Sequence, residues 1–216
     1  MTDELELLKR DWKKKGTDLP QLSYDEIHKM IWKKSSSIVK WILIISILEF
    51  TLPQLLIFVP SVGDVMKIYD HIGVSNYLFV LSLIIYAVAL YYIFQFYRRF
   101  KEISVLDNSK NLMRKIIKTR KTVKHYIIFS LSMIMVTIII MLIGVYLNED
   151  ITQIVPELKE SLEKVPPDKL RTTLMLTIGI FGLVFTLCMG GVYFLLYGLL
   201  LRKLNKNYAE LRQLEF

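Results

Sequence analysis

One acidic residue lies inside a long apolar stretch of this sequence, where a charged side chain is costly. Glu49 occurs in SILEFTLPQLL, and Pro53 follows it one helical turn later. Placing an acidic residue at the centre of a membrane-spanning helix costs about 2.5–3.5 kcal/mol, so such a residue indicates a functional group by default. A site that takes up a proton or a cation would use this carboxylate, with Pro53 opening the helical backbone beside it.

A packing role explains the same residue. No lysine, arginine or histidine lies deep in another apolar stretch, and burial without a cation favours the neutral acid. That acid would hydrogen-bond across a helix bundle while Pro53 kinks its own helix. Glu49 lies about eleven residues into its apolar segment, so about 16 Å along it at 1.5 Å per residue and near the membrane midplane. Hydroxyl groups at similar depth are candidate partners: Ser46, Tyr86, Thr137 and Thr186.

The choice between these roles rests on the number of titratable groups. A proton pathway normally needs more than one, and the apolar stretches offer only Glu49 at this depth. We therefore expect packing rather than transport, while the proton- or cation-linked role stays open as the alternative.

Other residue types with chemical potential do not form a recognisable site. The three histidines, His28, His71 and His125, share no metal-ligand spacing, and Cys188 is the single cysteine. The sequence contains no phosphate-binding loop, no zinc-protease motif and no nucleophile with an evident base. We therefore expect a non-enzymatic protein without a catalytic residue, metal or cofactor.

The apolar residues gather into segments long enough to cross a bilayer. The chain has 216 residues, of which 53% are hydrophobic, and a mean hydropathy of +0.41. About 20 helical residues span the hydrocarbon core. Four segments meet this length: residues 38–59, 77–97, 126–147 and 174–201. The predicted fold is an all-α, polytopic membrane protein with four transmembrane helices. Because no cleavable signal peptide is evident at the start of the sequence, we expect the first span to act as the insertion signal.

Positive charge is distributed unevenly between the two sides of these spans. Of the 28 lysines and arginines, 23 lie in the residues up to Lys40 at the edge of the first span, between the second and third spans, or after the fourth, and five lie in the other two loops. The positive-inside rule places the 23 in the cytoplasm with both termini. These residues are suited to the anionic lipid of the inner leaflet. No nucleic-acid-binding motif accompanies them, so a nucleic-acid partner is not expected.

The expected cytoplasmic parts are helical rather than disordered. They comprise an amphipathic arm (1–37), a helical hairpin (98–125) that turns near residues 107–109, and a tail (202–216), and Ser23 with Glu26 predicts a capping box at the second helix of the arm. Apolar residues recur at helical spacing in the arm and tail, and they could pack on this chain, on the membrane or on a protein partner: Leu5, Leu8, Trp12, Ile27, Ile31, Leu204, Tyr208 and Leu211.

The two outer loops differ in pattern. The first, residues 60–76, is short and turn-rich, so no long element is expected there. The second, residues 148–173, predicts a short amphipathic helix with Ile154, Leu158 and Leu162 on one face.

Small residues form a ridge along the fourth span. Gly182, Thr186 and Gly190 follow the small-x-x-x-small pattern that lets two helices approach closely. The helix-packing residues expected from this pattern are Gly179, Gly182, Thr186, Gly190 and Gly198. The facing helix could belong to the same chain or to a second copy, and a four-helix bundle favours the same chain.

The stretch LLKRDWKKKGTDLPQLSYDEIHKMIWKKSSSIVKWILIISILEF, from Leu7 to Phe50, resembles an uncharacterised family of small multi-span inner-membrane proteins of flavobacteria and their relatives. The resemblance implies a bacterial inner membrane and carries no activity or ligand. We expect a structural or regulatory protein that binds a protein partner, or a second copy, through its basic cytoplasmic helices. The alternatives are a proton- or cation-linked transporter or channel subunit that uses Glu49, and a membrane-tethered regulator with the layout of anti-sigma factors, for which the arm is short.

Overall fold

The computed structural model describes residues 23–55, 61–103, 109–148 and 166–214, together with the single positions 6 and 58. These residues form helices, and no strand occurs among them. In chain order the helices are α2 (Tyr24–Leu55), α3 (Ser61–His71), α4 (Ser75–Glu102), α5 (Ser109–Leu147), α7 (Pro167–Tyr193), the π-helix η4 (Phe194–Gly198) and α8 (Leu199–Leu214). The described chain is therefore all-α, as predicted.

Four helical segments are long and apolar enough to cross a membrane: Asp25–Leu55, Ser75–Glu102, Lys110–Leu147 and Pro167–Glu210. Each overlaps one of the four predicted spans and is longer than the roughly 20 residues that a bilayer requires. The last segment is continuous because η4 joins α7 to α8 without a break in the helical backbone.

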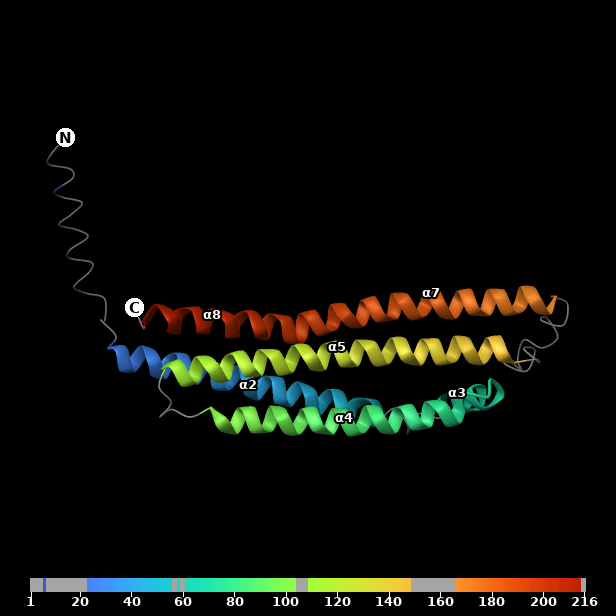
Figure 1. Cartoon of the computed structure of the whole chain (residues 1–216), viewed down its shortest axis with the longest axis horizontal. Helices are drawn as coiled ribbons and strands as arrows, with labels where there is room; N and C mark the ends of the chain where they lie inside the picture. The colour runs from blue at the N-terminus through green and yellow to red at the C-terminus, as the bar shows by residue number, and fades with distance from the viewer. Residues whose placement is uncertain are drawn as a thin grey trace.

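The long helices run side by side along one axis (Figure 1). Helix α2 packs on α4 and α8, and α5 packs on α4, α7 and α8. Helix α2 begins, α4 ends, α5 begins and α8 ends at the same end of the bundle, which we call the basic end; α3 lies at the opposite end. Helix α2 stops well short of the α3 end, so α4, α5 and α7 form the long walls of that half.

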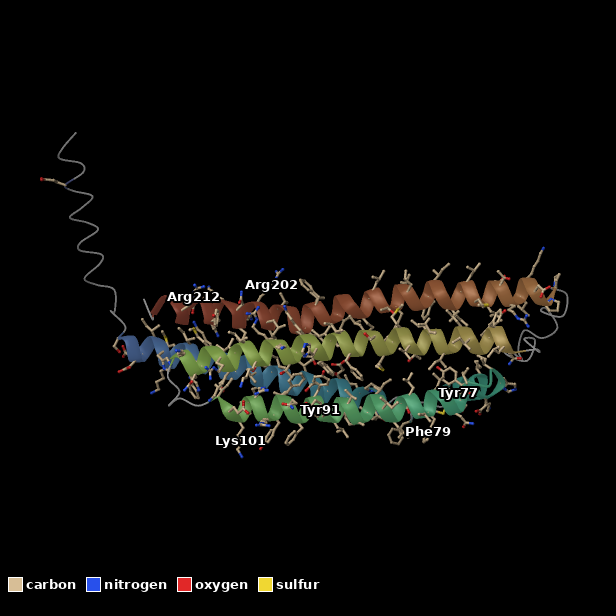
Figure 2. All side chains as sticks on the ribbon, viewed as in Figure 1. Tyr77, Phe79, Tyr91, Lys101, Arg202 and Arg212 are labelled. Atoms are coloured by element: carbon tan, nitrogen blue, oxygen red, sulfur yellow. The ribbon has the colours of Figure 1, made fainter. Side chains whose placement is uncertain are left out.

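Charged residues mark the basic end in side-chain view. Lys101, Arg202 and Arg212 lie there, whereas Tyr77 and Phe79 lie toward the α3 end (Figure 2). The first residue of α2 is fixed by the predicted capping box, which is confirmed. The Ser23 backbone N–H donates to Glu26 Oε2 at 2.8 Å, and the Glu26 N–H donates to Ser23 Oγ at 3.3 Å.

The main core lies toward the basic end and continues outside the predicted spans. Leu112, Ile116 and Leu204 are completely buried there although no predicted span contains them. Two hydrogen bonds between helices accompany this packing. The Asn207 side chain donates to Ser35 Oγ at 3.0 Å, and Arg120 donates to Asn205 Oδ1 at 2.8 Å. The helices thus form a packed bundle beyond the predicted spans.

A smaller core closes the α3 end. Buried Ile72, Val74, Val145 and Leu170 bring together the α3–α4 turn, the end of α5 and the start of α7. The turn needs glycine because Gly73 has a φ of 75°, which side chains with a Cβ rarely adopt. The first outer loop was predicted as turn-rich, and it instead contains the eleven-residue helix α3.

Several predicted features fall outside the described residues. These are the first arm helix with Leu5, Leu8 and Trp12, the hairpin turn near residue 107, and the outer-loop helix with Ile154, Leu158 and Leu162. The side chain of Leu211 is likewise outside the description.

Candidate functional site

Glu49 meets two tyrosines from the far end of the chain. Its half-buried carboxylate projects from α2, and the hydroxyl of Tyr193 donates to Oε1 while that of Tyr197 donates to Oε2 at 3.0 Å. Both tyrosine side chains are buried, with exposed fractions of 5% and 0%. No ion pair to Glu49 occurs within the described part of the chain. Hydroxyl donors therefore replace the missing cation as partners of this carboxylate.

The local backbone of the fourth segment places both hydroxyls on one carboxylate. Tyr193 ends α7, and Tyr197 lies in η4. A π-helix is a local widening that changes the angular spacing of side chains, and it is often found at functional sites. The Phe194 backbone N–H, at the junction, donates to the carbonyls of both Gly190 and Gly191. This junction and the four-residue spacing bring the two rings to the same side of the helix.

The rings of Tyr193 and Tyr197 belong to an aromatic cluster. Its members are Tyr92, Phe96, Tyr126, Tyr193 and Tyr197. The Tyr126 ring meets those of Phe96, Tyr193 and Tyr197 edge to face, with centroids 5.7, 6.4 and 6.0 Å away. Such contacts add about 0.5–1.5 kcal/mol each beyond the buried area. The hydroxyls are thus held by rings that are themselves packed in the core.

Pro53 changes the backbone next to the carboxylate. It lies inside α2, which continues only to Leu55. Because proline has no N–H, the carbonyl four residues earlier, that of Glu49, lacks its usual helical donor. Glu49 therefore offers hydrogen-bond acceptors on both its side chain and its backbone, and a cation or a water molecule needs such acceptors.

A cavity of about 260 Å³ lies beside Glu49 and Pro53, between α2, α4, α5 and α7. Its walls are mostly aromatic and aliphatic, with hydroxyls from Ser130 and Thr137. A second cavity of about 390 Å³ between α5 and α7 reaches Tyr69 of α3, and Ile134 and Thr137 line both cavities. Two hollows therefore lie one after the other along α5, the first beside Glu49 and the second nearer the α3 end.

None of the four partners predicted for Glu49 is one of its two tyrosine donors, although two of the four lie near it. Tyr86 and Thr137 line the same cavity, and Tyr86 meets Phe50 edge to face at 5.9 Å. Three of the four candidates instead donate to carbonyls of their own helices: Ser46 to Leu43, Thr137 to Met133, and Thr186 to Gly182. The two tyrosines were missed because the prediction counted depth along each helix and did not fix how the helices are offset.

The level of Glu49 in the bundle follows from these contacts. Its partners Tyr193 and Tyr197 belong to the last third of the fourth predicted span, and Tyr126 is the first residue of the third. Glu49 therefore lies closer to the basic end than counting from Ile38 indicates. The signal that could have revealed the pair is the four-residue spacing of two tyrosines in an otherwise apolar span.

The predicted glycine ridge makes close contact at one point. A Cβ on Gly182 would lie 2.8–2.9 Å from three side-chain atoms of Ile138 in α5. A Cβ added at Gly198 would lie 3.1 Å from the Phe194 ring of its own helix. A Cβ added at Gly179 or Gly190 would meet no such atom within 4 Å. The helix that approaches Gly182 thus belongs to the same chain.

The apolar stripes predicted for the arm and tail contribute to the core at the basic end. Ile31 and Leu204 are buried, with exposed fractions of 3% and 0%, and Ile27 and Tyr208 pack against the same core. Within the described residues, these side chains therefore pack on the chain's own helices.

The geometry restricts the chemistry that this site can perform. It combines one carboxylate, two tyrosine hydroxyl donors and a largely apolar cavity, and no group of three or more potential metal ligands of the His, Cys, Asp or Glu type occurs among the described residues. This arrangement can hold a proton, bind a small cation or lock two helices together.

The chain belongs to the family described as "Domain of unknown function (DUF8845)", whose model matches residues 25–216. The match includes nearly all of α2 and every later helix. This finding agrees with the resemblance to an uncharacterised family, and the description names no activity, ligand or site residue. No curated protein and no solved structure matches the chain.

Proposed function

We propose that this protein is a non-enzymatic integral membrane protein of the bacterial inner membrane. In this proposal its basic helical bundle binds another protein, or a second copy of the chain, in a structural or regulatory role. The observation that supports it is the core outside the predicted spans, where Leu112, Ile116 and Leu204 are fully buried. Attraction to lipid alone would need only a few flexible lysines.

The basic end is well suited to present a surface at some distance from the membrane. Helix α5 extends about 25 Å beyond the predicted start of its span, at 1.5 Å per residue from residue 109 to residue 125. The charge asymmetry between loops supports a cytoplasmic location for this end and for both termini. A packed, protruding and positively charged body is suited to an acidic protein surface.

Site-specific photo-crosslinking in intact cells tests this role. We expect a crosslinker that replaces Lys118 or Ala209, both exposed on the basic bundle, to give one discrete protein adduct. The matched control is the same crosslinker at Leu187, whose exposed side chain lies within the fourth span. A result with no protein adduct at either bundle position, for a chain that is correctly inserted, would contradict the proposal.

A truncation defines the part of the chain that the interaction needs. Removing residues 1–22 leaves α2 and its capping box intact, whereas removing residues 1–34 also deletes buried Ile31. We expect the shorter truncation to keep the bundle folded, so that loss of the adduct would assign binding to the arm. A retained adduct would assign it to the bundle.

A second candidate function is proton- or cation-linked transport through Glu49. It is favoured by the two adjoining cavities along α5, which simple helix packing would not require. In this role the cation would be bound by the Glu49 carboxylate and by the Glu49 backbone carbonyl, which lacks its usual helical donor because residue 53 is proline. Ser130 and Thr137 offer further oxygen atoms on the same cavity wall.

Reconstitution in lipid vesicles distinguishes the two candidates. The transport role predicts proton or Na⁺ flux with wild-type protein and none with Glu49→Gln, which retains shape and loses the charge. Glu102→Gln is the matched control, because Glu102 lies at the basic end and pairs with Arg98 and Arg99. If wild type and Glu49→Gln give the same background flux, the transport role is excluded and Glu49 acts as a helix lock.

A further inference from the structure

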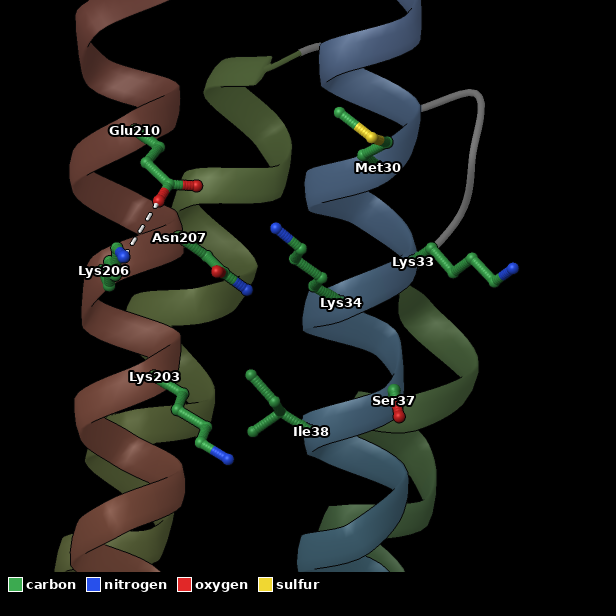
Figure 3. Close-up of a pocket in the computed structure, with 9 residues that line it drawn as sticks. All are labelled: Met30, Lys33, Lys34, Ser37, Ile38, Lys203, Lys206, Asn207 and Glu210. Atoms are coloured by element: carbon green, nitrogen blue, oxygen red, sulfur yellow. Dashed lines mark ion pairs between the residues drawn. The ribbon is translucent and has the colours of Figure 1, made fainter.

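A lysine-lined groove separates α2 from α8 at the basic end. It has a volume of about 570 Å³ and is lined by four lysines, Lys33, Lys34, Lys203 and Lys206, and by one acidic residue, Glu210. Figure 3 shows Lys34 and Lys203 extending into the gap from opposite helices. The groove therefore concentrates positive charge between two helices that must remain packed together.

The acidic residue leaves most of this charge uncompensated. Glu210 pairs with Lys206 on its own helix at 4.0 Å. No ion pair to Lys33, Lys34 or Lys203 occurs within the described residues. The Lys34 and Lys203 side chains enter the gap at different levels (Figure 3). Positive charges gathered in one gap repel, and this repulsion acts against the packing of α2 on α8. A bound anion would remove it.

Buried contacts between α2 and α8 fix the two walls of the groove. Asn207, which lines the groove, donates to Ser35 across the α2–α8 contact at 3.0 Å, and both side chains are buried. Leu204, one turn away on α8, is completely buried. A site whose walls are already fixed loses little conformational entropy when it binds a ligand.

The position of the groove relative to the spans points to lipid. Lys34 precedes Ile38, the first residue of the first predicted span, by one helical turn, and Lys203 follows the end of the fourth span by two residues. Both ammonium groups therefore belong at the level of the lipid headgroups. Ile38 lines the groove on the side toward the membrane (Figure 3), where an acyl chain would leave a bound headgroup.

We propose that this groove is a specific binding site for the phosphate of an anionic phospholipid, such as phosphatidylglycerol. Lys34 and Lys203 bind the phosphate from opposite helices, and Asn207 and Lys206 face the polar headgroup. Basic pockets between membrane helices bind anionic headgroups in this way. The lipid then joins α2 to α8 at the point where their own charges repel.

The test uses the full chain in detergent with phosphatidylglycerol added, and it measures retained lipid by native mass spectrometry and affinity by lipid titration. The Lys34→Gln/Lys203→Gln variant should bind about thirtyfold more weakly, at about 1 kcal/mol per lysine. The matched control is Lys121→Gln/Lys124→Gln. It removes two exposed lysines at a similar depth on α5 and should stay within twofold of wild type.

Thermal unfolding separates loss of binding from loss of folding. Without anionic lipid, Lys34→Gln/Lys203→Gln should unfold at the same temperature as wild type or higher, because the repulsion is gone. With phosphatidylglycerol, wild type and the control should gain stability while the groove variant gains little. The Lys34→Arg/Lys203→Arg variant should restore binding because it restores the charge.

Three results would overturn the proposal. Equal losses in the groove variant and the α5 control would show a diffuse charge effect without a site. Equal binding of phosphatidylcholine would show that the phosphate charge is not recognised. Inorganic phosphate that stabilises the lipid-free protein and displaces phosphatidylglycerol would assign the groove to a soluble phosphate compound instead.

Discussion

At the scale of single residues, the carboxylate of Glu49 illustrates how a membrane protein can hold an acid without a base. A buried carboxylate lowers its free energy by accepting hydrogen bonds, and each of its oxygens accepts one from a tyrosine hydroxyl. The two donors follow Glu49 in the chain by 144 and 148 residues. The pair therefore fixes the first segment against the last, in addition to satisfying the acid.

This arrangement predicts that either hydroxyl contributes measurably to stability. Tyr193→Phe or Tyr197→Phe should lower the free energy of unfolding by about 1 kcal/mol, a typical value for a hydrogen bond between membrane helices. The double variant should lose more than the sum, because both oxygens of the half-buried acid are then unpaired. Unfolding in detergent, followed by circular dichroism, provides the measurement.

The control for this prediction is Tyr146→Phe. Tyr146 is 63% exposed at the far end of α5, so its hydroxyl should contribute almost nothing. In the Glu49→Leu background, the two tyrosine substitutions should lose most of their effect because their acceptor is gone. Equal losses in both backgrounds would show that the tyrosines stabilise the protein through ring packing alone.

At the scale of helices, the contact between α5 and α7 depends on the absence of one side chain. Any residue with a Cβ at position 182 would overlap Ile138, whose atoms would lie 2.8–2.9 Å away. We expect Gly182→Val to lower the unfolding temperature by several degrees, because overpacking a helix contact typically costs about 1–3 kcal/mol. Ile138→Ala in the same chain should recover part of the loss by making room.

Gly179→Ala is the matched control on the same helix, since no atom lies within 4 Å of the added methyl group. It should leave the unfolding temperature unchanged or raise it slightly, because alanine favours the helix over glycine. If Gly179→Ala were as harmful as Gly182→Val, close approach between these helices would not be the reason for either effect.

Sequence patterns are reliable for helices and weak for the relations between them. Four apolar segments and the Ser23–Glu26 capping box were predicted correctly because both depend on residues close in the chain. Helix α3 was missed because a short amphipathic helix has the same composition as a turn-rich loop. The π-helix η4 was missed because no residue type specifies it.

The candidate site shows the same division. Hydropathy alone identified Glu49 and Pro53, since a charge and a proline are conspicuous in an apolar segment. Its tyrosine partners depend on the axial offset of two helices, which is set by packing across the whole bundle. Gly182 was predicted because its spacing is local, whereas the close approach of Val74 to Gly144 needed the path of the α3–α4 turn.

At the scale of the whole molecule, the four long helical segments alternate in direction, so that the start of the first and the end of the last lie at the basic end. Helix α2 begins and α8 ends there, and so do the two helix ends that the 98–125 hairpin was expected to connect. From the positive-inside rule we predict that this end lies in the cytoplasm and the α3 end in the periplasm. Binding of a cytoplasmic protein requires that orientation, whereas transport through Glu49 and lipid binding in the groove do not.

Single cysteines can report this orientation in a Cys188→Ser background. Lys118 and Lys206 are exposed at the basic end, and Lys169 is exposed at the start of α7. In intact spheroplasts, a membrane-impermeant maleimide should label Lys169→Cys and should leave Lys118→Cys and Lys206→Cys unlabelled until the membrane is permeabilised. The permeabilised sample is the control for intrinsic reactivity. Labelling of the two basic-end positions in sealed spheroplasts would show that the basic end faces the periplasm. A cytoplasmic binding partner could then not reach the bundle.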